Sequence, residues 1–224
     1  EIIFTNPNMS KIFLSKKMLQ KAKKLKIICT ASTGTNHIDI DFSKKRKIKI
    51  LSLRSNKKII NKISSTAEHA LTLIMSKIRN VFEAAVSVKK GNWDYRPFIG
   101  RQMTALKVGV MGYGRLGKMY ARYIDALGAK VLLYDPKLSG KISADGFRVV
   151  SKEDLFSFSD VISLHFHASN ENFKFVNSEL LEIAKPELFL INTARGEIID
   201  ESALVNFLRK NIDLVDDQIY YLLS

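Results

Sequence analysis

Short apolar runs alternate with amphipathic segments along most of the chain. The runs predict buried strands at residues 1–4, 25–29, 48–53, 108–111, 131–134, 160–164 and 188–191. The segments between them carry apolar residues at helical spacing and predict helices at residues 15–24, 40–47, 117–127, 151–158, 178–184 and 200–210. Strands that alternate with helices form parallel sheets whose two faces are covered. The pattern therefore predicts an α/β fold.

The longest amphipathic segment begins at Ser65 and Glu68, which have the spacing of a capping box. Apolar side chains recur on one helical stripe as far as residue 89. At about 1.5 Å per residue, such a helix would be more than about 30 Å long and could bridge two domains. A looped segment with three aromatic residues follows at residues 91–100. We therefore predict one domain at residues 1–88 and a second at residues 89–224.

The composition is that of a globular protein in a reducing compartment. Hydrophobic residues make up 46% of the 224 positions, and no apolar run approaches the roughly 18 residues needed to span a bilayer. No signal peptide precedes the first strand. The single cysteine, Cys29, lies in an apolar run, which predicts a buried, inert side chain and no disulfide framework. These features predict a cytoplasmic protein with no membrane partner.

Positive charge is concentrated at the start of the chain. The formal net charge is +14, and residues 1–60 hold 15 Lys and Arg against 3 Asp and Glu. Such asymmetry fits either a surface for nucleic acid or acidic membrane, or simply solvated helix faces. The second interpretation is favoured because no aromatic stacking platform lies among the basic residues. Binding of nucleic acid through residues 1–60 stays open as an alternative function.

Residues 107–136 have the order strand, glycine-rich turn, helix, strand and acid. In that order Gly112 permits the tight turn, Gly114 lets the backbone approach a pyrophosphate, and Gly117 lets the helix pack closely on the strand. The phosphates would bind at the start of the helix. Asp135 follows Gly117 by 18 positions and can accept hydrogen bonds from the adenosine ribose. Because a carboxylate repels a 2′-phosphate, the stretch predicts a site for NAD rather than NADP.

Other chemically active side chains lie at the predicted ends of neighbouring strands. Arg195 follows the strand at residues 188–191, where a guanidinium can bind a carboxylate with two hydrogen bonds and polarise a carbonyl. The alternative is an ordinary surface arginine. His165 and His167 end the strand before it and either line the cofactor pocket or form local hydrogen bonds. Local hydrogen bonding is the favoured interpretation.

The loop after residues 25–29 carries Thr33, Gly34 and His37, which we expect to face a ligand-binding cleft. Asp39, at the end of that loop, has the position of a helix cap. No group of Cys and His residues has the spacing of a metal site, so we predict no bound metal.

Several stretches, in order and spacing, resemble the D-isomer-specific 2-hydroxyacid dehydrogenase family, particularly its phosphoglycerate dehydrogenase-like branch. The resemblance covers nearly all of residues 25–210. It is carried by residues 32–39, 66–69, 91–93, 112–117 with Asp135, 159–165 and 191–200. It implies a Rossmann doubly wound parallel sheet that binds NAD, preceded by a partial flavodoxin-like substrate domain. It also implies a homodimer.

The resemblance assigns roles to individual residues. It places Arg115 and Leu116 at the pyrophosphate and Asp135 at the ribose. It places further residues near the cofactor: Thr66, His165, Thr193, Ala194 and Arg195. It puts Thr33 and Gly34 at the substrate, and Arg195 on the substrate's carboxylate and carbonyl as the catalytic residue. The implied reaction moves hydride between nicotinamide and C2 of a 2-hydroxy or 2-keto acid of the phosphoglycerate, glyoxylate or hydroxypyruvate type.

The chain also departs from the family pattern. The family's acid/base histidine lies downstream of the arginine motif, but no histidine follows His167 here. The opening strand and helix of the substrate domain are missing as well. We therefore expect an internal piece of an enzyme or a truncated relative. A non-catalytic module that senses NAD is the alternative within the same fold.

Overall fold

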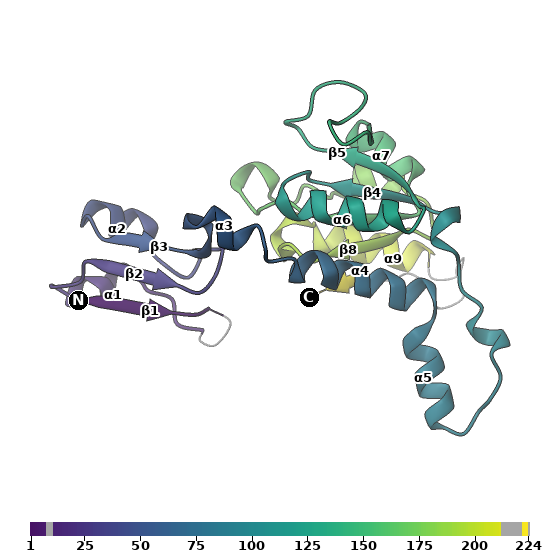
Figure 1. The fold of residues 1–224 in the computed structure, drawn as a ribbon, viewed down its shortest axis with the longest axis horizontal. Helices are drawn as coiled ribbons and strands as arrows, with labels where there is room; N and C mark the ends of the chain where they lie inside the picture. Colours follow the sequence, from purple (N-terminus) through teal and green to yellow (C-terminus); the bar gives the residue numbers. More distant parts are fainter. Residues whose placement is uncertain (8–10, 212–220, 224) are drawn as a thin grey trace. The chain divides into compact units, whose positions relative to one another are not determined.

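The computed structural model describes residues 1–7, 11–211 and 221–223, and the chain divides into two compact units, Glu1–Ile63 and Ser64–Ser224 (Figure 1). Both units are built on parallel sheets with helical connections, as the apolar pattern predicts. None of the helices in the described ranges combines the length and apolar character that crossing a membrane requires.

The first unit is a three-stranded parallel sheet. Its strands β1 (Ile2–Thr5), β2 (Ile27–Thr30) and β3 (Lys49–Leu51) lie in the order β1-β2-β3. The connections hold helices α1 (Lys16–Lys21), α2 (Ile40–Lys45) and α3 (Lys57–Ile60), with a 3-10 turn at Leu53–Ser55. The core of the unit consists of the buried residues Leu14, Leu19, Leu25, Ile28, Ile38 and Ile48.

Polar side chains fix where the first two helices begin and end. The Met18 amide donates to the Ser15 hydroxyl at 3.4 Å, and the Phe42 amide donates to the Asp39 carboxylate at 2.9 Å. The predicted cap at Asp39 is therefore present. The Arg46 guanidinium donates to the Leu19 carbonyl at 2.7 Å near the end of α1, where that carbonyl also accepts from the Ala22 amide at 3.2 Å.

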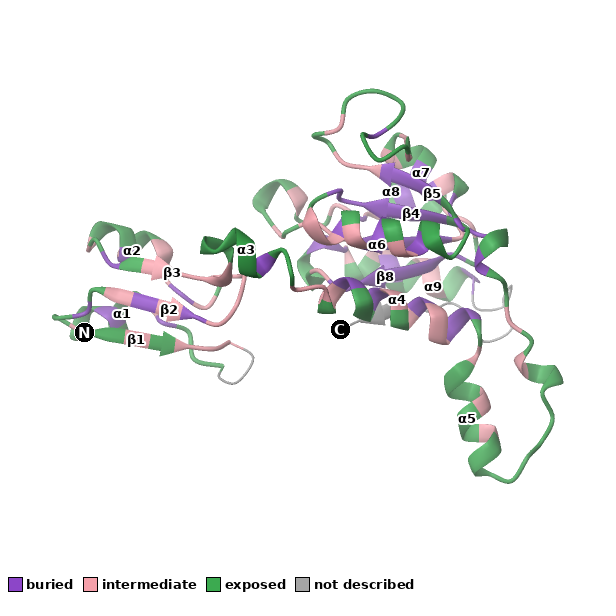
Figure 2. Cartoon of the chain, viewed as in Figure 1, coloured by how far each residue is buried: buried purple, intermediate pink, exposed green. Residues whose placement is uncertain are grey.

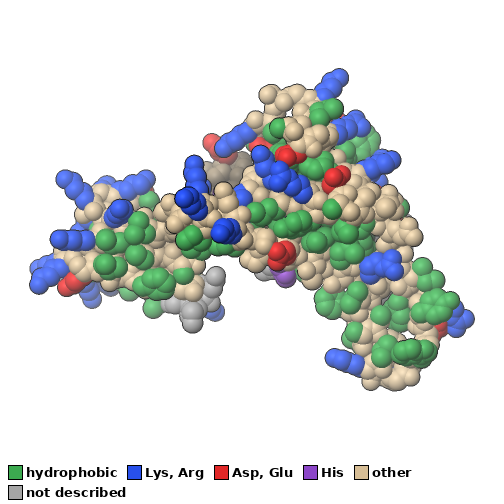
Figure 3. All heavy atoms as spheres, viewed as in Figure 1, with side chains coloured by type: hydrophobic (Ala, Val, Ile, Leu, Met, Phe, Trp, Pro, Cys, Tyr) green, Lys and Arg blue, Asp and Glu red, His purple; other side chains and the backbone are tan. Residues whose placement is uncertain are grey.

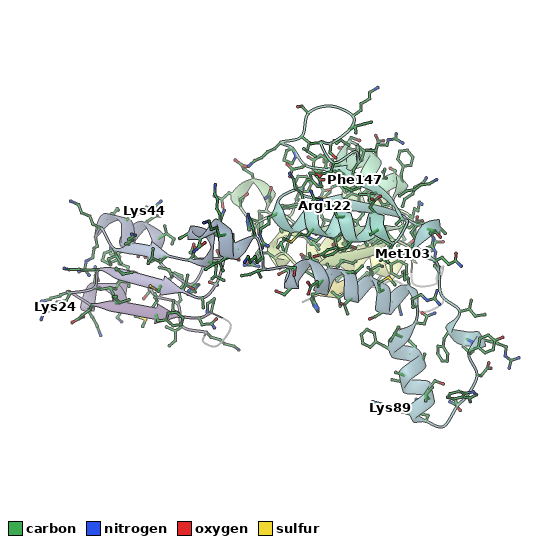
Figure 4. All side chains as sticks on the ribbon, in the orientation of Figure 1. Lys24, Lys44, Lys89, Met103, Arg122 and Phe147 are labelled. Atoms are coloured by element: carbon green, nitrogen blue, oxygen red, sulfur yellow. The ribbon has the colours of Figure 1, made fainter. Side chains whose placement is uncertain are left out.

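Two features of the first unit bear on the predictions. Cys29 is half-buried rather than buried, because the alternation along β2 places it on the face opposite Ile28. The lysines between residues 11 and 58 are all exposed, as expected for solvated helix faces. Figure 3 shows these cations spread over the surface, and Figure 4 labels Lys24 and Lys44 among them.

The second unit is a six-stranded parallel sheet in the order β6-β5-β4-β7-β8-β9. The order reverses between β4 and β7, as in doubly wound dinucleotide-binding folds. The strands are β4 (Lys107–Met111), β5 (Lys130–Tyr134), β6 (Arg148–Val149), β7 (Val161–Leu164), β8 (Phe189–Asn192) and β9 (Tyr221–Leu223). Short 3-10 turns lie at Arg96–Phe98, Met103–Ala105, Asn170–Asn172 and Gly196–Ile198.

Helices cover both faces of this sheet. One face packs against α4 (Ser65–Ile78) and α6 (Arg115–Ala126). The other face packs against α7 (Lys152–Phe158), α8 (Ser178–Glu182) and α9 (Glu201–Asn211). Because side chains alternate along each strand, both faces of the central strands are buried, and β4 and β8 are coloured as buried in Figure 2.

Helix α4 packs within the second unit. Its residues Ala67, Ala70, Ile74 and Ile78 are at most 3% exposed and share one core with α6 and β4. The chain consequently divides between residues 63 and 64, whereas we predicted the domain boundary after residue 88. The apolar stripe of α4 showed that one face is buried but did not show which sheet covers it.

The single helix predicted for residues 65–89 is wrong, because the chain forms two helices. After α4 the chain turns at Asn80, which has the left-handed φ of 51°, and α5 (Val81–Lys89) begins. The chain later returns past the end of α4, where the Arg101 amide donates to the Ile78 carbonyl at 2.9 Å. A Cβ on Gly100 would lie 2.0 Å from that carbonyl oxygen, so only glycine allows this approach. Helix α5 has no buried residue.

Candidate functional site

The candidate site lies at the carboxyl ends of β4 and β7, where the strand order reverses. The loop after β4 is held in place by the Gly112 amide, which donates to the Tyr134 carbonyl at 2.7 Å. Gly112 has a φ of +95°, which L side chains rarely adopt. A Cβ on Gly112 would also lie 3.0 Å from the carbonyl carbon of His165. The ends of the two strands are therefore packed directly against each other.

The other two glycines of the motif differ in what surrounds them. A Cβ on Gly117 would lie 1.9 Å from the Gly112 carbonyl oxygen, so this glycine allows α6 to lie close to the end of β4. A Cβ on Gly114 would have no heavy atom within 4 Å. Gly114 is exposed and directly precedes the first turn of α6, whose amide groups have no partner inside the helix. This open backbone can accept an anionic group.

Asp135 follows β5 and faces the glycine loop. One carboxylate oxygen accepts a hydrogen bond from the Tyr113 amide at 2.8 Å, and the other accepts one from the Lys137 amide at 2.8 Å. These bonds orient the carboxylate. Because an ionised carboxylate has about four lone-pair sites, Asp135 can still accept hydrogen bonds from a sugar.

A polar cluster joins the glycine loop to the loop that follows β5. The Tyr113 hydroxyl donates to the Asp145 carboxylate, and the Arg122 guanidinium donates to the same carboxylate at 2.8 Å (Arg122 is labelled in Figure 4). The Lys118 ammonium lies 5.2 Å from the centre of the Tyr113 ring. Burial, helped by the bond to Asp145, raises the pKa of Tyr113 to about 12. The bonds from Arg122 and Tyr113 lower the pKa of Asp145.

His165 packs beneath the glycine loop. Its amide donates to the Met111 carbonyl at 2.8 Å, and its ring lies against Tyr120 with the ring centres 4.8 Å apart. The Nε2 atom is buried and has no hydrogen-bond partner within the described ranges. Burial lowers the pKa of His165 to about 3, so the ring is neutral at physiological pH. His167 is exposed, and its carbonyl accepts a hydrogen bond from the Asn172 amide group at 2.6 Å.

The end of β8 presents the second polar segment of the site. The Asn192 side chain accepts from the Ala194 amide at 3.0 Å and donates to the Arg195 carbonyl at 2.8 Å, which fixes the turn. Arg195 is exposed and donates one hydrogen bond to the Ala194 carbonyl at 2.6 Å. The Thr193 hydroxyl is buried, with no hydrogen-bond partner among the described residues.

The remaining predicted site residues belong to different units. Thr66 is half-buried in the first turn of α4, within the second unit. Thr33 and Gly34 lie in the first unit, in a loop where the Ser32 hydroxyl donates to the Gly34 carbonyl at 2.6 Å. His37 lies 3.1 Å from the Thr30 hydroxyl, and burial lowers the pKa of His37.

Sequence reasoning missed three residues of this region. Asn192 orients the segment from Thr193 to Arg195, and its position directly before that segment was the available signal. Asp145 and Arg122 gave no signal, because Asp145 is 32 positions from the Tyr113 hydroxyl that it binds.

Comparisons with known proteins agree with this arrangement. Residues 71–213 match the family model described as "D-isomer specific 2-hydroxyacid dehydrogenase, NAD binding domain". The D-3-phosphoglycerate dehydrogenase of Mycobacterium tuberculosis (strain ATCC 25618 / H37Rv) is 34% identical over 190 residues, which cover 84% of this chain and 35% of that protein. The glyoxylate reductase of Thermococcus litoralis is 29% identical over 225 residues, covering 93% of this chain and 66% of the relative.

A solved structure is similar in fold as well. The D-lactate dehydrogenase from Aquifex aeolicus, complexed with NAD and lactic acid, superposes with a TM-score of 0.79 at 32% identity. The match covers 94% of this chain and 61% of that one. The chain thus spans about a third of the length of the phosphoglycerate dehydrogenases that it matches.

Alanine substitution can separate the roles of Gly117 and Gly114. We expect Gly117→Ala to lower the free energy of unfolding by about 1 to 3 kcal/mol, because the new Cβ overpacks the contact with Gly112. This loss would occur although alanine is about 1 kcal/mol better than glycine inside a helix. Gly114→Ala should change stability by less than about 0.5 kcal/mol but weaken NADH binding at least tenfold. Urea unfolding and NADH fluorescence titration measure the two effects; equal stability of both variants would contradict the packing role of Gly117.

The Tyr113 phenol should make stability sensitive to alkaline pH. Its pKa is raised to about 12 in the folded chain, whereas the unfolded value is about 10. A raised pKa gives stability that is complete below pH 10 and is lost as the pH rises towards 12. Between pH 8 and 11 we expect the free energy of unfolding of wild type to fall by about 1 kcal/mol more than that of Tyr113→Phe. Urea unfolding at each pH tests this, and parallel pH curves would contradict it.

Proposed function

The chain belongs to the D-isomer specific 2-hydroxyacid dehydrogenase family, and we propose that it forms the NAD-binding part of an oxidoreductase. The proposed reaction transfers hydride between nicotinamide and C2 of a 2-hydroxy or 2-keto acid of the phosphoglycerate, glyoxylate or hydroxypyruvate type. The observation that carries the proposal is the glycine loop packed against the end of β7 at the reversal of the strand order. Ligands of open α/β sheets bind at this point.

The residues at the site fit a dinucleotide. The exposed Gly114 backbone and the first turn of α6, with Arg115 and Leu116, would hold the pyrophosphate. The Asp135 carboxylate would accept hydrogen bonds from the ribose. The buried, unpartnered Thr193 hydroxyl supports a further polar contact near the end of β8. We assign the other cofactor contacts to Thr66, Gly112, Gly117, His165, Ala194 and Arg195. When bound, NAD supplies the hydride chemistry itself.

Arg195 is the residue that we assign to the substrate. Its guanidinium uses one hydrogen bond on the Ala194 carbonyl, and the group has five N–H donors in all. The remaining donors can bind a carboxylate and stabilise negative charge on the carbonyl oxygen of the substrate. The family resemblance also assigns Thr33 and Gly34, in the first unit, to substrate binding.

Proton exchange with the substrate needs a different group. Arginine stays charged in proteins and cannot release a proton at neutral pH. Burial holds the pKa of His165 at about 3, so the protonated imidazolium form that could act as the acid is not populated near neutral pH. The family resemblance implies that a histidine outside residues 1–224 carries out this step, and we propose that assignment.

Arg195 provides the direct test of the reaction. We expect residues 1–224 alone to reduce hydroxypyruvate and glyoxylate far below the usual enzyme range of about 1 to 10³ per second. In a longer protein that contains this chain, Arg195→Gln should lower kcat/KM by about 10²- to 10³-fold. Arg209→Gln, which removes an exposed guanidinium on α9, serves as the control. Full turnover by residues 1–224 would refute the proposal that the acid lies outside these residues. NADH binding without turnover in the longer protein would favour a module that only senses NAD.

We propose that the site prefers NAD to NADP because of Asp135. Its carboxylate faces the glycine loop and would repel a 2′-phosphate. We expect wild type to bind NADH at least tenfold more tightly than NADPH, and Asp135→Asn to narrow this ratio while keeping an acceptor for the Tyr113 amide. Fluorescence titration with both cofactors measures the ratio. Equal wild-type affinities would refute the proposal, and Asp154→Asn is the control for a lost surface charge.

We also propose a homodimer formed through α5 and the segment after it. This region exposes large apolar side chains that a monomer would leave in water: Val81, Phe82, Val86, Val88, Trp93, Tyr95 and Ile99. Figure 3 shows apolar side chains gathered over α5. Light scattering at micromolar concentration should give twice the monomer mass, and Phe82→Asp should reduce it to the monomer mass. Phe173→Asp, at an exposed phenylalanine outside this region, should leave the dimer intact; a monomeric wild type would contradict the proposal.

A further inference from the structure

A second candidate binding site lies at the amino ends of β4, β5 and β6. A cavity of about 600 Å³ opens there, which is within the usual range for small-molecule pockets. Its lining includes Lys107, the first residue of β4, whereas the glycine loop follows the last residue of the same strand. At about 3.3 Å per residue, the two sites lie about 13 Å apart along β4. The cavity is thus separate from the cofactor site.

Three cations enter this cavity from three adjacent strands. Lys107 of β4 pairs in register with Lys130 of β5, and Arg148 of β6 pairs with Leu132, two residues after Lys130. Alternate residues of a strand share a face, so all three basic side chains lie on the face covered by α7. Neighbouring strands are only about 5 Å apart, so these like charges repel one another.

Few acidic side chains lie near these three cations. In the described ranges, neither the Lys130 ammonium nor the Arg148 guanidinium has an acidic partner within 4.0 Å. The Lys107 ammonium lies 5.8 Å from the centre of the Phe158 ring, which is a cation–π contact. Asp125 is the one acidic side chain that lines the cavity. The site therefore favours an anion.

The cavity also has an apolar wall. Phe158 of α7 lines it on the same face as the cations, whereas Ala129, Val131 and Phe147, which pack with the core on the α6 face, line its other side. Phe147 is held from behind by Tyr113, with the ring centres 6.4 Å apart and the planes at 85° (Phe147 is labelled in Figure 4). Pockets that combine apolar walls with a few convergent charged groups bind ligands that carry both features.

We propose that this cavity binds a small organic anion that carries an apolar group. The negatively charged phosphate or carboxylate lies between Lys130 and Arg148, where a guanidinium can form two parallel hydrogen bonds. The apolar group lies on Phe147 and Phe158. The proposal does not depend on the dehydrogenase activity, because none of these residues belongs to the cofactor site.

Phenyl phosphate is a suitable probe because it joins a dianion to an aromatic ring. We would titrate it into the isotope-labelled chain of residues 1–224 and follow the backbone amides by NMR, with phenol and inorganic phosphate in parallel titrations. We expect saturable shifts at Gly146, Phe147 and Arg148, and an affinity at least fivefold higher than that of either fragment. Shifts confined to residues 112–117 would place the anion at the glycine loop and overturn the proposal.

Charge-removing variants complete the test. We expect Lys130→Gln and Arg148→Gln each to weaken phenyl phosphate binding by about five- to tenfold, because each removes a charged hydrogen-bond donor. Lys210→Gln removes an exposed lysine on α9 and should change the affinity by less than about twofold. Equal losses in all three variants would show a general charge effect and refute the site. If a variant unfolds, the comparison of phenyl phosphate with phenol and inorganic phosphate on the wild-type chain still tests the proposal.

Discussion

The close approach of α6 to the end of β4 is the contact on which the second unit depends. A Cβ on Gly117 would lie only 1.9 Å from the Gly112 carbonyl oxygen. Because glycine has no Cβ, the helix can start immediately after the strand. That approach places the amides of the first helical turn at the reversal of the strand order. The same turn brings Gly112 against the backbone of His165, which joins the ends of β4 and β7. A packing constraint between two backbones thus places the exposed Gly114 backbone and the start of α6 at the reversal of the strand order.

Tyr113 extends this contact into the rest of the unit. Its amide donates to Asp135, and its hydroxyl donates to Asp145 on the loop between β5 and β6. The ring supports Phe147, which lines the cavity at the amino ends of the strands. One residue therefore holds Asp135 through its backbone and the wall of a separate cavity through its ring. Because the hydroxyl donates to a carboxylate, ionising it would remove that hydrogen bond and place two negative charges side by side.

The sequence predicted what depends on local pattern and missed what depends on distant contacts. Apolar runs located β1, β2, β3, β4, β5, β7 and β8 to within two residues, because a buried strand needs a continuous apolar stretch. Spacing alone identified the roles of Gly112 and Gly117. The break at Asn80 was missed because the apolar stripe continues through it into α5, and because the segment at Gly100 that contacts the end of α4 is distant in the sequence. The hydrogen bond from Tyr113 to Asp145 was missed because the two residues are 32 positions apart.

Burial decides what a histidine at a strand end can do, and sequence position does not. His165 ends β7 beside the glycine loop, where an exposed imidazole would titrate near neutral pH and could exchange protons. Its ring instead packs on Tyr120, and the loss of water lowers its pKa to about 3. The packing that brings β7 against Gly112 is therefore the same packing that keeps this ring neutral. Arg195, by contrast, stays exposed, because the Asn192 side chain fixes its segment through hydrogen bonds to the backbone rather than through burial of the guanidinium.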